Sequence, residues 1–85
     1  MRELVEYVAK VLVEHTDQIE LREDDEGLLL LVADSDLGSV VGRRGKTARA
    51  IRAVVTASGG PDLEITSPEE LDAEESGADG DPDED

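Results

Sequence analysis

Residues 40–52, the most informative stretch of the sequence, read Val40-Val41-Gly42-Arg43-Arg44-Gly45-Lys46-Thr47-Ala48-Arg49-Ala50-Ile51-Arg52. Five of the eight Lys and Arg residues in the chain lie between Arg43 and Arg52, with no acid among them. Two glycines three positions apart allow a tight two-residue turn whose backbone can approach a ligand closely. A helix that starts after Gly45 would direct its free N–H groups and the positive end of its dipole at the same place. The pattern therefore predicts a phosphate-contacting loop between two helices.

The same spacing also suits an ordinary connection between helices that carries solvated arginines. Short glycine motifs arise by chance, and Gly77 and Gly80 repeat the spacing near the C-terminus. The setting of the first pair is nevertheless unusual, because the chain has 23 Asp and Glu residues and a net charge of −15. A solvated surface drawn from this composition is expected to be acidic rather than basic.

Hydrophobic periodicity outlines the elements that precede this stretch. Apolar residues recur at three- and four-residue intervals over residues 4–13, which is typical of an amphipathic helix. Residues 19–22 alternate and residues 28–33 form a continuous apolar run, so we expect an edge strand and a central strand, joined in a hairpin through residues 24–27. His15 is expected to interact with the C-terminal end of the first helix rather than to act in catalysis.

The elements that follow complete an α+β domain. Residues 34–36 (Asp-Ser-Asp) offer N-caps for a short helix that runs into Gly42. A second helix follows Gly45 and ends before residues 58–61 (Ser-Gly-Gly-Pro), and residues 63–66 alternate as a final strand. The order αββααβ, with a crossover long enough to return the chain parallel, predicts a three-stranded mixed sheet with helices packed on one face.

Charge divides the chain into two parts. Residues 1–67 carry 13 acids, 8 bases and nearly all the aliphatic side chains, whereas residues 68–85 carry ten acids, no base and one large apolar residue, Leu71. We therefore predict a folded domain over residues 1–67 and a disordered acidic tail over residues 68–85. Such a tail would aid solubility, or could fold back on the basic stretch and compete with its ligand.

Several classes of protein are disfavoured by what the sequence lacks. The chain has no cysteine, so disulfides, thiolate zinc sites and thiol nucleophiles are excluded. No apolar stretch approaches the roughly 18 residues of a membrane span, which favours a cytoplasmic protein without a membrane partner. Val40 stands where a P-loop ending at Thr47 needs glycine, and the carboxylates at 79–83 lack the later glutamate of a calcium loop. We expect no metal, no cofactor and no enzymatic activity.

The predicted fold and loop together resemble a known family. The order αββααβ, with Gly-Arg-Arg-Gly between the two central helices, resembles a type II KH domain, a fold that clamps about four nucleotides of single-stranded RNA or DNA. Residues 1–10 and 40–52 resemble the KhpA family of small bacterial KH-domain proteins, and the resemblance covers roughly residues 1–67. It implies a cytoplasmic, non-enzymatic RNA-binding protein that would suit an RNA chaperone or a post-transcriptional regulator. In some bacteria the family protein pairs with a larger KH-domain protein, KhpB.

The resemblance and the charge pattern together predict an RNA-binding site. By position, the family loop corresponds to Gly42, Arg43, Arg44 and Gly45. We expect phosphate contacts from the loop arginines and from Lys46 and Arg49, and aliphatic contacts to bases from Val40, Val41 and the central strand. Tyr7 is the only aromatic residue, so base stacking contributes little and the affinity should be modest.

Two questions about partners stay open at this level. A protein-interaction module of the same fold, with an incidental basic loop and no significant nucleic-acid binding, would also fit the net acidity. The central strand is apolar on both faces, so Leu29, Leu31 and Ala33 could meet a second copy of the chain or a larger KH-domain protein, or could line the nucleotide groove.

Overall fold

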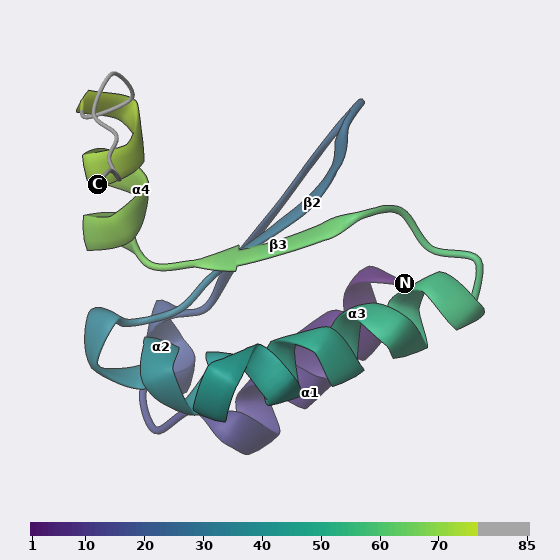
Figure 1. The fold of residues 1–85 in the computed structure, drawn as a ribbon, viewed down its shortest axis with the longest axis horizontal. Coiled ribbons are helices and arrows are strands. Elements are labelled where there is room, and N and C mark those ends of the chain that lie inside the picture. Colours follow the sequence, from purple (N-terminus) through teal and green to yellow (C-terminus); the bar gives the residue numbers. More distant parts are fainter. Residues whose placement is uncertain (77–85) are drawn as a thin grey trace.

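The computed structural model describes residues 1–76, which form a three-stranded sheet and its helices (Figure 1). In chain order the elements are α1 (Arg2–Leu12), the 3₁₀ turn η1 (Thr16–Gln18), β1 (Glu20–Asp24), β2 (Gly27–Leu31), α2 (Asp34–Val41), the short turn η2 (Arg43–Gly45), α3 (Lys46–Ala57), β3 (Leu63–Thr66) and α4 (Pro68–Ser76). The predicted order αββααβ is confirmed, and α4 follows it. Within residues 1–76, no helix is long and apolar enough to cross a membrane.

The sheet has the mixed topology that the sequence predicts. Its strand order is β1-β2-β3, with β1 antiparallel to β2 and β3 parallel to β2. Leu30 in the central strand lies opposite Leu21 on one side and Ile65 on the other. The crossover through α2 and α3 returns the chain to the end of the sheet where β2 begins, so β3 runs parallel to β2.

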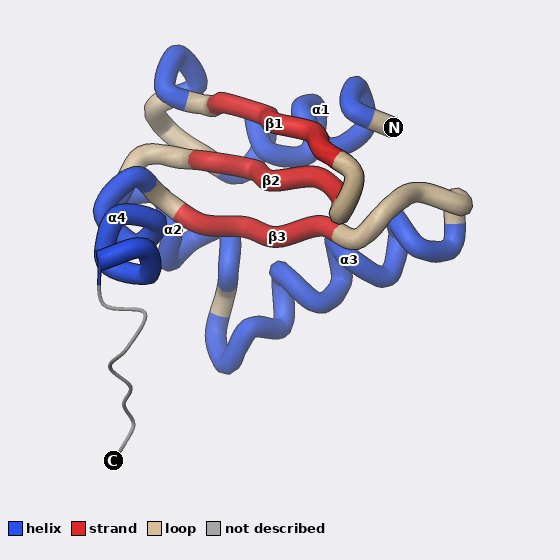
Figure 2. Tube along the Cα trace, turned by 90° about the horizontal axis from the view of Figure 1, so that it is seen from above, coloured by secondary structure: helices blue, strands red, loops and turns tan. Residues whose placement is uncertain are grey.

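Helices α1, α2 and α3 all lie on one side of the sheet, as Figure 1 and the view from above in Figure 2 show. Leu28, Leu30 and Val32 alternate toward this side and are almost completely buried. The core that they share with the helices also contains Val5, Ala9, Val13, Val40, Ala48, Ile51, Val55, Leu63 and Ile65. Burying one large aliphatic side chain contributes about 1.5–3 kcal/mol, so this interface stabilises the domain.

The opposite side of the sheet is partly covered by the chain itself, because α4 stands there beyond the end of β3 (Figure 1). Leu31 and Ala33 belong to the second apolar set of the central strand, yet only 3% and 5% of their surfaces are exposed. Leu31 and Ala33 are therefore already buried within this chain, without a partner. Leu29 is half-buried and lines, with Leu71 of α4, a shallow cavity of about 390 Å³.

Helix α4 contradicts the predicted disorder for residues 68–76, and the rest of the predicted tail, residues 77–85, lies outside the described residues. Ser67 accepts a hydrogen bond from the Glu70 N–H at 3.3 Å, which caps the first turn, and Pro68 occupies the first helical position. The Glu69 N–H donates to Asp34 Oδ1 at 3.0 Å, which anchors α4 on α2. The sequence Ser-Pro-Glu-Glu at residues 67–70 is a helix-start signal. The prediction of disorder rested on the acidic composition of the whole segment and did not take this local signal into account.

Asp36 is a buried carboxylate that ties α2 to the loop after α1. The backbone N–H groups of Glu14 and His15 donate to its two oxygens at 3.1 and 3.0 Å, and His15 Nδ1 lies 3.0 Å from Oδ2. Burial alone would raise the pKa of the Asp36 carboxyl, but these hydrogen bonds and the His15 ring hold the pKa below its ordinary value.

These contacts correct two expectations about capping. Helix α2 begins after Ala33 with no side-chain cap, because Asp36 accepts hydrogen bonds from the loop before β1 and Asp34 accepts one from α4. His15 contacts Asp36 rather than the end of α1, which stops at Leu12. In both cases a group from a distant segment takes the side chain that the local pattern assigns to a helix end.

Candidate nucleic-acid interface

The turn between α2 and α3 is built from unusual backbone conformations. Gly42, Arg44 and Gly45 have positive φ angles of 80°, 57° and 75°. A Cβ atom at Gly42 would lie 2.7 Å from the Cβ of Thr47 and 2.9 Å from its backbone nitrogen, so this position admits only glycine. The Gly45 N–H donates to the Gly42 carbonyl at 3.1 Å and closes the turn.

Arg44 occupies the left-handed region, with φ 57° and ψ 25°, although it has a side chain. A left-handed conformation costs a residue with a Cβ roughly 1–2 kcal/mol. Arg49 Nη1 donates to the Arg44 carbonyl at 2.8 Å and supports this conformation from the first turns of α3. Strain of this kind persists where surrounding contacts hold it, and it is frequent at binding sites.

The N-terminal end of α3 is open to a ligand. Its N-cap is Gly45, so no side chain accepts a hydrogen bond from the first-turn N–H groups, and the first turn carries no acid. These N–H groups and the helix dipole create a region of positive potential that favours an anion.

Three cations surround this helix end and have no partner among the residues that the structure describes. Arg43, Arg44 and Lys46 are exposed, and in residues 1–76 their side chains form no ion pair or hydrogen bond. By contrast, Arg2 and Lys10 each lie within 4 Å of a glutamate. We call Arg43, Arg44 and Lys46 the cationic loop. Its three charges stand in a chain whose net charge is −15.

Comparison with known proteins places this loop in a family. The family model described as KhpA/KhpB, KH domain, matches residues 2–61. The chain belongs to the KhpA/KhpB KH-domain family. The predicted membership and fold class are confirmed. Helix α4 lies outside the matched stretch.

Individual relatives agree with the family model. The chain is 42% identical over 62 residues to RNA-binding protein KhpA of Halalkalibacterium halodurans, covering 68% of this chain and 82% of that protein. It is 40% identical over 63 residues to RNA-binding protein KhpA of Bacillus subtilis, covering 69% and 78%. It is 38% identical over 69 residues to RNA-binding protein KhpA of Streptomyces coelicolor, covering 76% and 87%. No solved structure shows a significant match to this chain.

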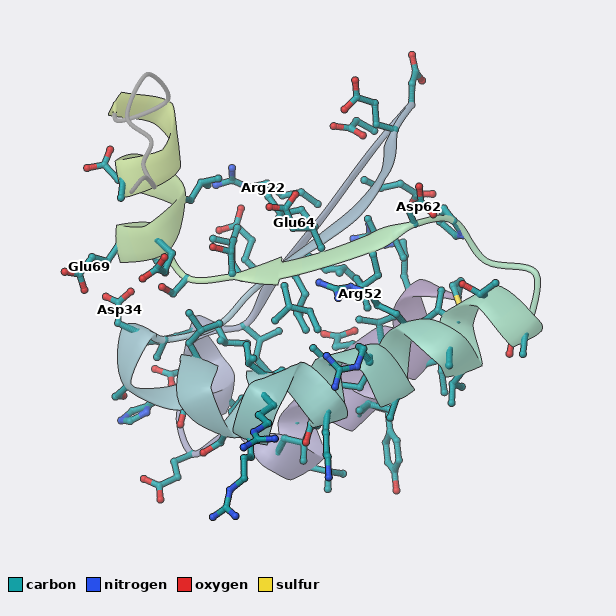
Figure 3. The ribbon with its side chains drawn as sticks, in the orientation of Figure 1. Arg22, Asp34, Arg52, Asp62, Glu64 and Glu69 are labelled. Atoms are coloured by element: carbon teal, nitrogen blue, oxygen red, sulfur yellow. The ribbon has the colours of Figure 1, made fainter. Side chains whose placement is uncertain are left out.

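Not every predicted site residue of this KhpA/KhpB-family chain is available to a ligand. Val40 is completely buried in the core, so the prediction that it contacts a base is wrong, whereas the neighbouring Val41 is only half-buried. Arg49 uses one guanidinium nitrogen to support the loop. Arg52 Nε donates to the Leu63 carbonyl at 2.9 Å, and Figure 3 shows its side chain reaching from α3 toward β3. Arg52 therefore joins helix and sheet instead of extending the cationic loop.

The central strand is also less available than predicted, because β1 and β3 flank it on both sides. The outer edges of the sheet belong to β1 and β3, and β3 is the one that Arg52 of α3 contacts. The carbonyls of Asp62 and Thr66 point toward the central strand. They accept hydrogen bonds from the N–H groups of Leu28 and Val32, at 2.7 and 3.1 Å respectively. Backbone groups alternate along a ladder, so the backbone N–H and C=O groups of Leu63 and Ile65 point away from β2, although both side chains are buried in the core.

Ile65 is a candidate site residue that the sequence pattern does not indicate. Arg52 already occupies the outward carbonyl of Leu63, which leaves the N–H and C=O of Ile65 to face a ligand at this edge. The register of β3 against β2 determines this, and no single residue type signals it.

Proposed function

We propose that this chain is a non-enzymatic, cytoplasmic protein that binds single-stranded RNA, with Gly42, Arg43, Arg44 and Gly45 holding the phosphate backbone. The RNA-binding domain spans residues 1–67, and a role as RNA chaperone or post-transcriptional regulator suits it. Its relatives bear the name RNA-binding protein KhpA, which describes binding rather than catalysis.

The observation that carries this proposal is the position of the cationic loop at the uncapped N-terminus of α3. Glycine at position 42 and the Arg49 support bring backbone N–H groups and cations toward the same point. A phosphate there meets N–H donors, the helix dipole and exposed positive charges together. Phosphate contacts hold the strand without reading its sequence.

Base contacts in this proposal come from Val41 and from the outward backbone of Ile65. An N–H and a C=O on one residue can donate to and accept from the edge of a base, and an aliphatic side chain can cover its face. Tyr7 lies on α1 and is 68% exposed, so this edge has no aromatic platform within the described residues. Stacking would add about 1–3 kcal/mol per base, and without it the affinity is modest.

The salt dependence of RNA binding tests the proposal. Each phosphate contact on a single strand contributes about −0.7 to the slope of log K against log salt, so the cationic loop predicts a slope near −2. Participation of Arg49 and Arg52 as well would steepen it to about −3.5. Fluorescence anisotropy with a labelled 12-nucleotide oligouridylate measures this slope. The salt concentration is varied from about 25 to about 300 mM, a range over which phosphate contacts change the affinity strongly.

The protein-interaction alternative predicts a different result. In that case the chain shows no measurable binding to the oligonucleotide even at the lowest salt concentration. This outcome would contradict the RNA-binding proposal, because screening is weakest there and any phosphate attraction is strongest.

We also propose that a second copy of the chain packs on the outer face of α1 and α3. Tyr7, Val11 and Val54 are 68%, 67% and 51% exposed on these helices. Beside them, a cavity of about 150 Å³ is lined only by apolar residues: Leu4, Val5, Val8, Ala50, Ile51, Val54 and Val55. Two copies that each carry −15 repel elsewhere, so an apolar face is where they can meet. A larger KH-domain protein of the KhpB type is the other occupant that this face would suit.

Val54→Glu is expected to convert a dimer into a monomer, because it places a charge in the apolar contact. Sedimentation of wild type and variant at high micromolar concentration measures the change. Thr56→Glu adds the same charge at an exposed position on another side of α3 and should leave the dimer intact. A wild-type chain that sediments strictly as a monomer would rule out the homodimer.

A further inference from the structure

Helix α2 lies between two regions of opposite charge. Its C-terminal end leads into the cationic loop, which has no acidic partner among residues 1–76. At its N-terminal end Asp34 is exposed on α2, and Glu69 and Glu70 are exposed on the first turn of α4. A strand of nucleic acid that follows α2 from the loop therefore starts at positive charge and ends at negative charge.

Hydrogen bonds to backbone groups hold the acidic turn of α4 in place. The Glu69 N–H donates to Asp34 and the Glu70 N–H donates to Ser67, which is only 1% exposed. Figure 3 shows Asp34 and Glu69 close together where α4 meets α2. Since the backbone makes these contacts, the carboxylates of Glu69 and Glu70 stay exposed to solvent.

The length of α2 sets the spacing between the two charged ends. Its eight residues rise about 1.5 Å each, so the loop and α4 are separated by roughly 12 Å along the helix. A stacked strand advances about 3.4 Å per nucleotide along its axis, so roughly four nucleotides cover this distance. Further phosphates would lie within about one Debye length, ~10 Å at 0.1 M salt, of the α4 carboxylates.

We infer that α4 limits the length of single strand that this surface accepts, a role that rests on the proposed RNA binding. A strand that ends before α4 is unaffected, whereas one that continues past it brings phosphates against Glu69 and Glu70. Because α4 is anchored at the end of α2 away from the loop, it acts where the strand leaves the surface. It does not occupy the phosphate site.

The test compares a 4-nucleotide and a 12-nucleotide oligouridylate by NMR titration of the full-length, ¹⁵N-labelled chain at low salt. Replacing Glu69→Gln and Glu70→Gln should tighten binding of the long strand by about threefold to fivefold and leave the short strand unchanged. Glutamine suits both the helix and the capping position, so α4 is retained. In the wild type, the amide signals of residues 69–71 should shift with the long strand alone.

A matched control separates this effect from general electrostatics. Asp25→Asn with Glu26→Gln removes the same charge at the exposed tip of the β1–β2 hairpin and should change neither affinity. Equal tightening for both strands, or equal tightening in the control, would overturn the inference while leaving RNA binding intact. A wild type that binds neither strand would contradict the proposed function itself.

Discussion

A chain carrying Arg43→Asp and Arg44→Asp should remain folded and lose RNA binding by on the order of 100-fold, since each lost charge-assisted contact is worth about 1.5 kcal/mol or more. Both side chains are exposed, and aspartate tolerates the left-handed conformation at position 44. Two attractions to phosphate become two repulsions at the end of α3. Anisotropy with a labelled 12-nucleotide strand measures the affinity, and circular dichroism checks the fold.

Arg2→Glu with Lys10→Glu is the matched control for this experiment. It changes the net charge by the same amount on α1, where both side chains are about half exposed. Exposed ion pairs of this kind contribute about 0–1 kcal/mol, so the control should stay folded and keep most of its affinity. If the loop variant is folded and binds RNA as tightly as wild type does, residues 42–45 are only a turn.

Replacing Asp36→Ala is expected to have the largest effect on stability, a fall in Tm on the order of 10 °C. The side chain of Asp36 is 6% exposed, and its removal leaves the N–H groups of Glu14 and His15 without their acceptor. Asp34→Asn is the control on the same helix, because Asp34 is exposed and asparagine keeps an oxygen for the Glu69 N–H. A thermal scan at pH 7 that finds the two variants equally stable would contradict this role.

The stabilising effect of Asp36 should also depend on pH in a defined direction. Its pKa in the folded chain is lowered, so the ionised form stabilises the fold above the unfolded-state pKa of about 4. The contribution is lost as the pH falls from there through the lower folded-state pKa. Urea midpoints of wild type and Asp36→Asn should therefore converge at acidic pH and differ most from pH 5 to 7, whereas a constant gap down to pH 3 would exclude this linkage.

Elements with a strong local pattern follow from the sequence alone. The three- and four-residue spacing of α1, the apolar run of β2 and the Ser-Gly-Gly-Pro end of α3 each act over a few neighbouring residues, so periodicity and turn chemistry suffice. The cationic loop belongs to the same class. Glycines at 42 and 45 and the local excess of positive charge are visible without any tertiary contact.

Other properties of the site depend on contacts between distant segments. Val40 and Val41 are both aliphatic, and only the packing of α2 against the sheet decides that Val40 is buried and Val41 accessible. The register of β3 points the backbone N–H and C=O of Ile65 away from β2, and Arg52 reaches from α3 to the Leu63 carbonyl of β3. Asp36 caps no helix because N–H groups more than 20 positions away along the chain reach its carboxylate first. Local sequence states which groups can donate or accept, but only the folded chain brings them to hydrogen-bonding distances of 2.9–3.1 Å, and that proximity selects the partner.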